Sequence, residues 1–369
     1  MLTHLAGPYV IGIDAGGTKT RCVVLTLTGA LAGTGTGPGA NPNSGGDTAG
    51  ALTTALSEAL GDVDRSLVLT GVFGIAGAGS AGRPAAVSAA RRAWHTCGLR
   101  GSPAVVTDIA VAFAAGTTAP KGIVVFSGTG AGAAVISDGT IVRRADGYGW
   151  LVGDEGSAVW LGREAVRAAL AALDGRSRPT LLTESVPRAL LGQAVLAQLG
   201  SVTPRHHRTH HRPAAAPAPA LAFAGAVTGT SPGPGGTTTL AREPAPRLPQ
   251  NPALAQAIIK EVYGRPPAAL GRLGPVVAAA AAAGDAVARR ITEEAAEWLL
   301  RDVDAVRAAL TDPSAPVVMH GSVLRDGPVA DAVRAGLRAR FDADPRRAGD
   351  GAVGAASLAM RRLGFPPPE

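Results

Sequence analysis

The stretch VIGIDAGGTKT, Val10–Thr20, leads an apolar strand into an aspartate and then into a short glycine turn. At Gly16 and Gly17 the missing side chains would let backbone N–H groups approach phosphate oxygens, and Thr18 and Lys19 would add a hydroxyl and a positive charge. A plain hairpin turn is the alternative reading. The spacing matches neither a P-loop nor a dinucleotide-binding turn, because β-branched residues resume at once where those motifs continue into a helix.

Asp14 ends this apolar strand. A carboxylate at the end of a buried strand is costly to bury unless it is paired, and beside a phosphate clamp its usual partner is a divalent cation. We therefore expect Asp14 to help hold a metal ion next to the glycine turn.

The pattern of strand, glycine turn, strand, turn and short strand returns in IVVFSGTGAGAAVISDGTIVRRADG, residues 123–147. Between the two copies, helices are expected over about residues 47–60 and 84–97, followed by a strand that ends at Asp108. Strands that alternate with helices indicate an α/β layered domain, and the repeat indicates two similar lobes. If the lobes face one another, their glycine turns would clamp a polyphosphate.

Composition fits two globular domains, because 369 residues with 46% hydrophobic and 17% charged content can bury two cores. The net charge is +7, but +5 of it belongs to residues 174–250, where eight Arg stand against three acidic residues. The rest of the chain is close to neutral. A nucleic-acid partner is therefore not expected.

Residues 174–250 have the composition of a low-complexity insertion. They hold eleven of the 28 prolines and the cluster RHHRTHHR at residues 205–212. Four histidines in six residues suggest a metal site, but no carboxylate or cysteine stands at ligand spacing nearby. A solvated insertion is the favoured interpretation.

Cysteine usage and hydropathy favour a cytoplasmic protein. Cys22 and Cys97 are far apart in sequence and neither belongs to a CxxC pair, so both are expected to be reduced. The longest apolar tract, residues 276–283, is far shorter than the roughly 20 residues that span a bilayer. The N-terminus lacks the basic and apolar regions of a secretion signal. No membrane partner is expected.

Asp108 closes the strand PAVVTD and precedes the apolar segment IAVAFAAG. A lone aspartate at this place is often the N-cap of the following helix. In a phosphoryl transfer it could instead accept the proton of a substrate hydroxyl, in line with the terminal phosphoryl group.

The segment GYGWLVGDEGSA, residues 147–158, places Asp154 and Glu155 between glycines and after two aromatic residues. Carboxylates that accept hydrogen bonds, with an aromatic ring for a C–H face, suit a ligand that carries several hydroxyls. The alternative is an acidic helix N-terminus, which the helix dipole favours.

Taken in order, five motifs resemble those of the actin-like ATPase and sugar kinase superfamily. They are DAGGTKT, VFGIAGAG, SGTGAG, MHGSV and GAVGAA, which look like the first phosphate, first connecting, second phosphate, adenosine and second connecting motifs. GDEGSA is similar to the BadF/BadG-type N-acetylglucosamine kinase-like family, and the composition resembles its actinobacterial glucosamine kinases.

This resemblance implies an α/β, two-lobed actin-like ATPase (ribonuclease H-like) fold with a duplicated βββαβα core and a cleft between the lobes. The N-terminal lobe would span residues 1–118. The C-terminal lobe would span residues 119–369 and carry the insertion at about 174–250.

The resemblance also implies an ATP- and Mg²⁺-dependent kinase acting on the 6-hydroxyl of D-glucosamine. Asp108 would be the catalytic base, and Asp14 would organise Mg²⁺ through water. Contacts to ATP would come from Asp14, Gly16, Gly17, Thr18, Lys19, Gly128, Thr129, Gly130, Gly321 and Ser322. Contacts to the amino sugar would come from Asn41, Gly77, Asp108, Gly147, Tyr148, Asp154, Glu155 and Ala158.

Two departures from the animal N-acetylglucosamine kinases touch the sugar pocket: Ala76 stands where those enzymes carry a serine, and Tyr148 where they carry a tryptophan. The protonated amine of glucosamine would favour a free carboxylate, which Asp154 or Glu155 could supply. N-acetylglucosamine remains the alternative substrate.

Two other functions within the resemblance stay open. An ATPase activator with an iron–sulfur cluster between subunits would need ligand cysteines, which Cys22 and Cys97 fit poorly. A sugar-sensing repressor would need a helix-turn-helix region or a zinc-type cysteine cluster. The resemblance leaves a homodimer open.

Overall fold

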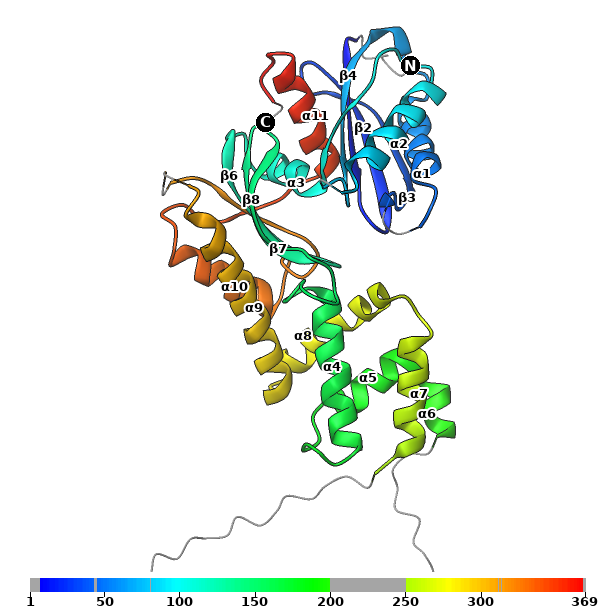
Figure 1. Cartoon of the computed structure of the whole chain (residues 1–369), viewed down its shortest axis with the longest axis vertical. Coiled ribbons are helices and arrows are strands. Elements are labelled where there is room, and N and C mark those ends of the chain that lie inside the picture. The colour runs from blue at the N-terminus through cyan, green and yellow to red at the C-terminus, as the bar shows by residue number, and fades with distance from the viewer. Residues whose placement is uncertain are drawn as a thin grey trace, which may run out of the picture.

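The computed structural model describes residues 7–42, 45–79, 81–199, 250–310, 312 and 314–367. Within them the chain forms two five-stranded sheets, one at each end of a central helical layer (Figure 1). The first sheet consists of β1 (Tyr9–Ala15), β2 (Lys19–Thr26), β3 (Leu31–Pro38), β4 (Val68–Ile75) and β5 (Ala104–Thr107). The second consists of β6 (Lys121–Ser127), β7 (Ala131–Ser137), β8 (Thr140–Asp146), β9 (Val317–His320) and β10 (Arg346–Arg347).

The two sheets have the same topology. Their strand orders are β3-β2-β1-β4-β5 and β10-β9-β6-β7-β8, so each begins as an antiparallel meander and adds two later strands beside its first. β1 pairs antiparallel with β2 and parallel with β4, and β6 does the same with β7 and β9. This duplicated arrangement confirms the two-lobed α/β fold expected from the sequence.

In the first lobe, α1 (Thr48–Leu60) and α2 (Arg83–Thr96) pack on one another and enclose an apolar core with the sheet. Phe73 of β4 and Trp94 of α2 meet edge to face in this core, with ring centroids 5.9 Å apart. Cys22 and Cys97 are both buried and unpaired, as expected for reduced thiols.

Two helices, α3 (Asp108–Gly116) and α11 (Gly351–Arg362), lie between the sheets and share a core with strands of both lobes (Figure 1). Their close approach depends on small residues. At Gly12, on β1, a side chain would collide with the backbone of Ala352 and Ala356 on α11. The segment GAVGAA thus brings the last helix of the chain directly against the strand that leads to Asp14.

The second lobe is extended by helices that pack below its sheet (Figure 1). They are α4 (Ala158–Leu173), α5 (Leu182–Leu191), α6 (Gln193–Gln198), α7 (Pro252–Tyr263), α8 (Gly274–Ala282), α9 (Ala286–Arg307) and α10 (Pro328–Arg338). A short 3-10 helix at Pro267–Leu273 packs on α4 in the same lobe, and another lies in the first lobe at Arg65–Leu67. Leu182, Val186 and Leu190 of α5 are buried in the lobe's core.

Residues 182–191 and 193–198, inside the low-complexity insertion expected at about 174–250, are therefore helical. The sequence favours these helices because leucines and valines recur at helical spacing, even though the surrounding composition is rich in Pro and Arg. The histidine cluster at residues 205–212 lies outside the described residues.

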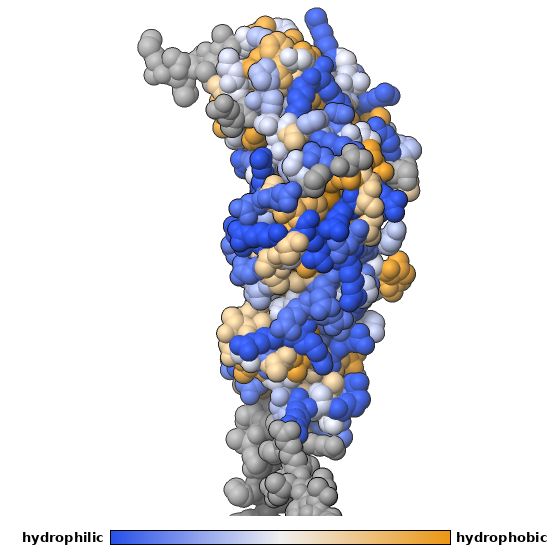
Figure 2. Space-filling model, turned by 90° about the vertical axis from the view of Figure 1, so that its left-hand side faces the viewer, coloured by the Kyte–Doolittle hydropathy of each residue, from blue (hydrophilic) through white to orange (hydrophobic). Residues whose placement is uncertain are grey.

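Hydrophilic residues cover most of the face seen in Figure 2, with apolar residues in small groups between them. The arginines of the described ion pairs are partly or largely exposed, and such pairs contribute about 0–1 kcal/mol each. Burial in the apolar clusters therefore dominates the stability of this fold.

Among the described residues, no single helix has the length and apolar composition to cross a membrane. The helical segments Pro267–Ala282 and Ala286–Arg307 reach that length and composition only together, and the break between them bends the pair by 118°.

Candidate active site

The first glycine turn joins β1 to β2 and presents an open backbone. The N–H of Gly16 donates to the carbonyl of Lys19 at 3.0 Å, which closes the turn. Gly17, Thr18 and Lys19 are exposed. The carbonyl of Gly16 accepts from the N–H of Ala40 at 3.0 Å, which holds the loop that carries half-buried Asn41 against the turn.

Asp14, one residue before the end of β1, lies where several carboxylates converge. Burial raises its pKa to about 7, with further increases from Asp108 and Asp350 and an opposing effect from Lys19. Asp350 caps α11 by accepting from the N–H of Ala352 at 3.0 Å, and it pairs with Arg21 of β2. Negative charge is thus concentrated beside the first glycine turn.

The second glycine turn joins β6 to β7 and is fixed from two sides. The N–H of Gly128 donates to the carbonyl of Gly130 at 2.9 Å, and its own carbonyl accepts from Ala158, the first residue of α4, at 2.8 Å. The carbonyl of Ser127 accepts from Val323 at 3.1 Å. This bond brings the segment with Gly321 and exposed Ser322 against the turn, while Thr129 is exposed at its tip.

Asp108 is the first residue of α3, so its carboxylate stands at a helix N-terminus, where the dipole favours negative charge. Burial nevertheless raises its pKa, opposed by His320, by the N–H of Ile109 and by Arg144. His320 ends β9 in the other lobe, and burial lowers its pKa while Asp108 opposes that shift. The expected base therefore lies between groups from both lobes.

Residues 147–153, the first part of the connection between β8 and α4, are called the sugar loop because the sequence predicts sugar contacts there. Its far end is anchored at Asp154, which is 7% exposed and accepts from the N–H of Ala131 at 3.2 Å, next to the second glycine turn. Tyr148 and Leu151 are each 72% exposed. The loop thus presents apolar side chains to solvent beside the place where phosphate would be held.

Asp146, the last residue of β8, closes the base of the sugar loop. Its carboxylate accepts backbone N–H groups of Asp154 at 2.9 Å, Glu155 at 3.0 Å and Tyr148 at 3.3 Å. Its φ of 54° lies in the left-handed region, which aspartate tolerates better than most residues. Sequence reasoning missed this residue, although an Asp-Gly pair at a strand end is a turn signal.

The expected sugar contacts come from elements of both lobes. Gly77 follows Ala76, whose N–H donates to the carbonyl of Ala15 at 2.8 Å, so this turn lies beside the end of β1. Burial raises the pKa of Glu155, and the nearby carboxylate of Asp146 raises it further. Ala158 is 8% exposed, so its backbone N–H, bound to the second turn, is its described link to the site.

Residues 11–359 match the model of the BadF/BadG/BcrA/BcrD ATPase family. The chain belongs to this family. The match extends from the first strand to the last helix, and it confirms the resemblance drawn from the five motifs.

One curated relative of this BadF-family chain is an N-acetylmuramic acid/N-acetylglucosamine kinase of Clostridium acetobutylicum, 34% identical over 176 residues. The alignment covers 47% of this chain and 57% of that enzyme, so the chain spans little more than half the length of the relative it matches.

Two solved structures share the fold over almost their full length. One is a candidate N-acetylglucosamine kinase from Chromobacterium violaceum, with 23% sequence identity and a TM-score of 0.60; the match covers 95% of this chain and 98% of that one. The other is a candidate N-acetylglucosamine kinase from Porphyromonas gingivalis, with 17% identity and a TM-score of 0.61; the match covers 96% of this chain and 99% of that one. At these identities the likeness concerns the fold, and it supports the two-lobed arrangement.

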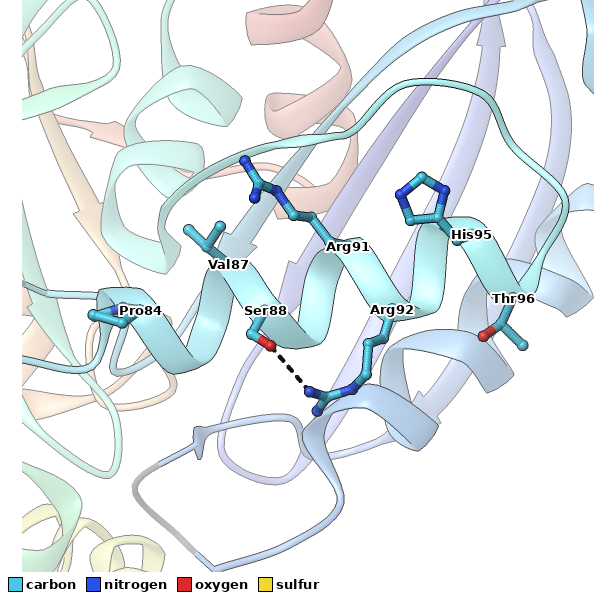
Figure 3. Close-up of a pocket in the computed structure, with 7 residues that line it drawn as sticks. All are labelled: Pro84, Val87, Ser88, Arg91, Arg92, His95 and Thr96. Atoms are coloured by element: carbon cyan, nitrogen blue, oxygen red, sulfur yellow. Dashed lines mark hydrogen bonds between the residues drawn. The ribbon is translucent and has the colours of Figure 1, made fainter.

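A surface hollow of this BadF-family chain lies away from these groups, along the exposed side of α2 (Figure 3). One helix supplies its whole lining: Pro84, Val87, Ser88, Arg91, Arg92, His95 and Thr96. Arg92 donates to the hydroxyl of Ser88 at 3.0 Å. None of these residues belongs to either glycine turn or to the sugar loop, so the hollow adds nothing to the candidate site.

Asp302 of α9 is a partly buried carboxyl group whose pKa responds to the carboxylates of Asp146 and Glu155 at the sugar loop. Burial raises its pKa from 3.8 to about 7, with further increases from Asp146 and Glu155. Because the folded state binds this proton more tightly than the unfolded chain, rising pH between about 4 and 7 lowers stability through this group. Asp302→Asn should raise the free energy of unfolding by about 1–2 kcal/mol at pH 8, after allowance for solvent screening, with little change at pH 4.

Urea unfolding of wild type and variant at both pH values measures this effect. Glu294→Gln, an exposed carboxylate on the same helix, is the matched control and should not change the pH dependence. A variant that is less stable than wild type at pH 8 would show that the Asp302 carboxylate is stabilised in the folded state.

Proposed function

We propose that the chain is an ATP- and Mg²⁺-dependent kinase that transfers the γ-phosphoryl group to the 6-hydroxyl of a 2-amino-2-deoxyhexose. The observation that carries the proposal is the position of Asp108 at the start of α3, the helix that lies between the two sheets. Its charge interacts with Asp14 beside the first glycine turn and with Arg144 at the base of the sugar loop. A general base between a phosphate clamp and a polyol site is what this transfer requires.

Asp108 would accept the proton of the 6-hydroxyl as that oxygen bonds to the γ-phosphorus and the bond to the β-phosphate oxygen breaks, releasing ADP. A base works best when its pKa is near the working pH, and burial moves the pKa of Asp108 upward in that direction. Closure of the lobes would exclude water, so that the sugar rather than water is the acceptor. A cytoplasmic location is part of the same proposal.

The carboxylates beside the first glycine turn fit a magnesium ion. Among the described residues, no three His, Cys, Asp or Glu side chains are placed to bind a metal by themselves. Mg²⁺ usually keeps several waters and uses one or two carboxylates together with substrate phosphates, which suits Asp14. Bound there, the ion would neutralise charge on the phosphates, and the backbone of both turns would hold the remaining phosphate oxygens.

Two substrates fit this site about equally. The name of the relative from Clostridium acetobutylicum favours N-acetylglucosamine. The carboxylates of Asp154 and Glu155 favour glucosamine, but burial raises the pKa of both and so disfavours the ionised forms that a protonated amine would pair with. Tyr148, exposed on the sugar loop, would stack on either sugar.

Initial rates of ADP release by the full chain with glucosamine, N-acetylglucosamine and glucose test the proposal. We expect kcat/KM for at least one amino sugar to exceed that for glucose by about 10-fold or more, as one well-formed polar contact to the carbon-2 substituent would give. Rates that do not depend on any sugar would overturn the kinase proposal and favour an ATPase of another role.

A further inference from the structure

Arg144 of β8 makes contacts that the proposed function leaves unexplained. Its Nε donates to the carbonyl of Asp146 at 2.8 Å, and its Nη2 donates to the carbonyl of Gly147. One guanidinium therefore binds the last residue of the strand and the first residue of the sugar loop. At Gly147, where φ is 76°, a side chain would collide with this guanidinium, so the sequence leaves room for it.

The guanidinium is held from a second direction by Phe126. The Cζ atom of Arg144 lies 5.9 Å from the centroid of the Phe126 ring, within the range of a cation–π contact. Phe126 is the residue before Ser127, where the second glycine turn begins. Arg144 thus connects the strand that leads to the phosphate clamp with the loop expected to hold the sugar.

The charge of Arg144 reaches two carboxylates of the candidate site. It opposes the rise in the pKa of Asp108 and that of Asp154, which burial causes. His320 of β9 and Asp14 of β1 also interact with Asp108. Arg144 stands out among these groups because it also binds the backbone of the sugar loop.

We propose that Arg144 is a positioning residue for sugar phosphorylation, whose guanidinium fixes the start of the sugar loop relative to Asp108. The assignment rests on the proposed function for its kinetic consequence, but the positioning itself concerns the loop alone. Arginine suits this task because its planar fork can donate to two carbonyls at once, whereas a lysine offers a single point charge on a flexible stem.

Kinetics of Arg144→Ala test the proposal. Losing two charge-assisted hydrogen bonds should raise KM for the amino sugar about 10- to 100-fold and change KM for ATP by less than about twofold. Guanidinium at millimolar concentration should restore part of the sugar affinity, and Arg144→Lys should recover only a small part. The matched control is Arg143→Ala, the neighbouring arginine, which is exposed like Arg144 and whose side chain has no hydrogen bond or ion pair in the described part of the chain.

Hydrogen exchange gives a readout that does not depend on activity. In the sugar-free full chain, the amides of Tyr148, Asp154 and Glu155 should exchange at least about 10-fold faster in Arg144→Ala than in Arg143→Ala, with exchange in β6 and β7 unchanged. Equal exchange in the two variants, or parallel rises in KM for sugar and ATP, would overturn the proposal. Faster exchange in an enzyme without turnover on any amino sugar would retain the positioning role and reject the proposed function.

Discussion

Asp108→Asn should lower kcat for the amino sugar about 10³-fold, within the range for loss of a general base. The amide keeps the shape of the side chain but cannot accept the proton of the 6-hydroxyl. Because burial disfavours the ionised carboxylate, the substitution should not lower the melting temperature. KM for ATP should stay within about twofold of wild type, since Asp108 is expected to contact the sugar and not the nucleotide.

The matched control for this variant is Asp331→Asn, which removes an exposed carboxylate of α10 and should retain full activity. Steady-state kinetics with saturating ATP and a melting curve on each protein are sufficient. If Asp108→Asn keeps more than about a tenth of wild-type kcat, another group is the base.

Asp14→Asn should lower kcat about 100-fold and raise the Mg²⁺ concentration needed for half-maximal rate, because it removes the carboxylate expected to organise the ion. The same change should increase stability. The carboxyl has a pKa of about 7 in the folded chain against 3.8 as its ordinary value, so rising pH across that window costs folding free energy. At pH 8 the metal-free variant should therefore melt at a higher temperature than wild type.

This opposition between activity and stability separates a functional carboxylate from a structural one. Asp62→Asn, an exposed carboxylate of the same lobe, should alter neither property. An Asp14→Asn protein that is both less stable and unchanged in its Mg²⁺ requirement would assign Asp14 a structural role.

The duplicated fold was predictable because its signal is local and repeated. Each lobe begins with the same run of strand, glycine turn and strand, and the two runs form β1–β2 and β6–β7. The helices 48–60 and 83–96 follow from apolar periodicity. The packing of α11 on β1 was harder to predict from the sequence, because the two elements are more than 300 residues apart. Small residues permit such close packing but do not specify which elements meet.

The helices α5 and α6 show where composition misleads. Arginines and prolines between residues 174 and 199 lower the expectation of order, yet Leu182, Val186 and Leu190 are buried in the second lobe. Tertiary burial of one apolar face outweighs the composition of the segment.

The residues expected to carry chemistry stand out in the sequence because they lie at a turn or strand end, whereas the residues that hold these segments in place do not. Asp14 and Asp108 stand out in sequence because each lies at the carboxyl end of an apolar strand. Asp146 and Arg144 act through backbone contacts of the sugar loop, which depend on the loop's conformation and leave little trace in residue spacing. His320 was read only as part of the MHGSV motif, although it interacts with Asp108 across the lobes.

The most direct test of the central claim is the identity of the product. Full-length protein would be incubated with Mg²⁺-ATP and glucosamine or N-acetylglucosamine, and the product examined by ³¹P–¹H correlation NMR. We predict a phosphomonoester coupled to the two protons on carbon 6, and none from the 6-deoxy sugar. Release of inorganic phosphate without a sugar phosphate, or a phosphate on another carbon, would contradict the account.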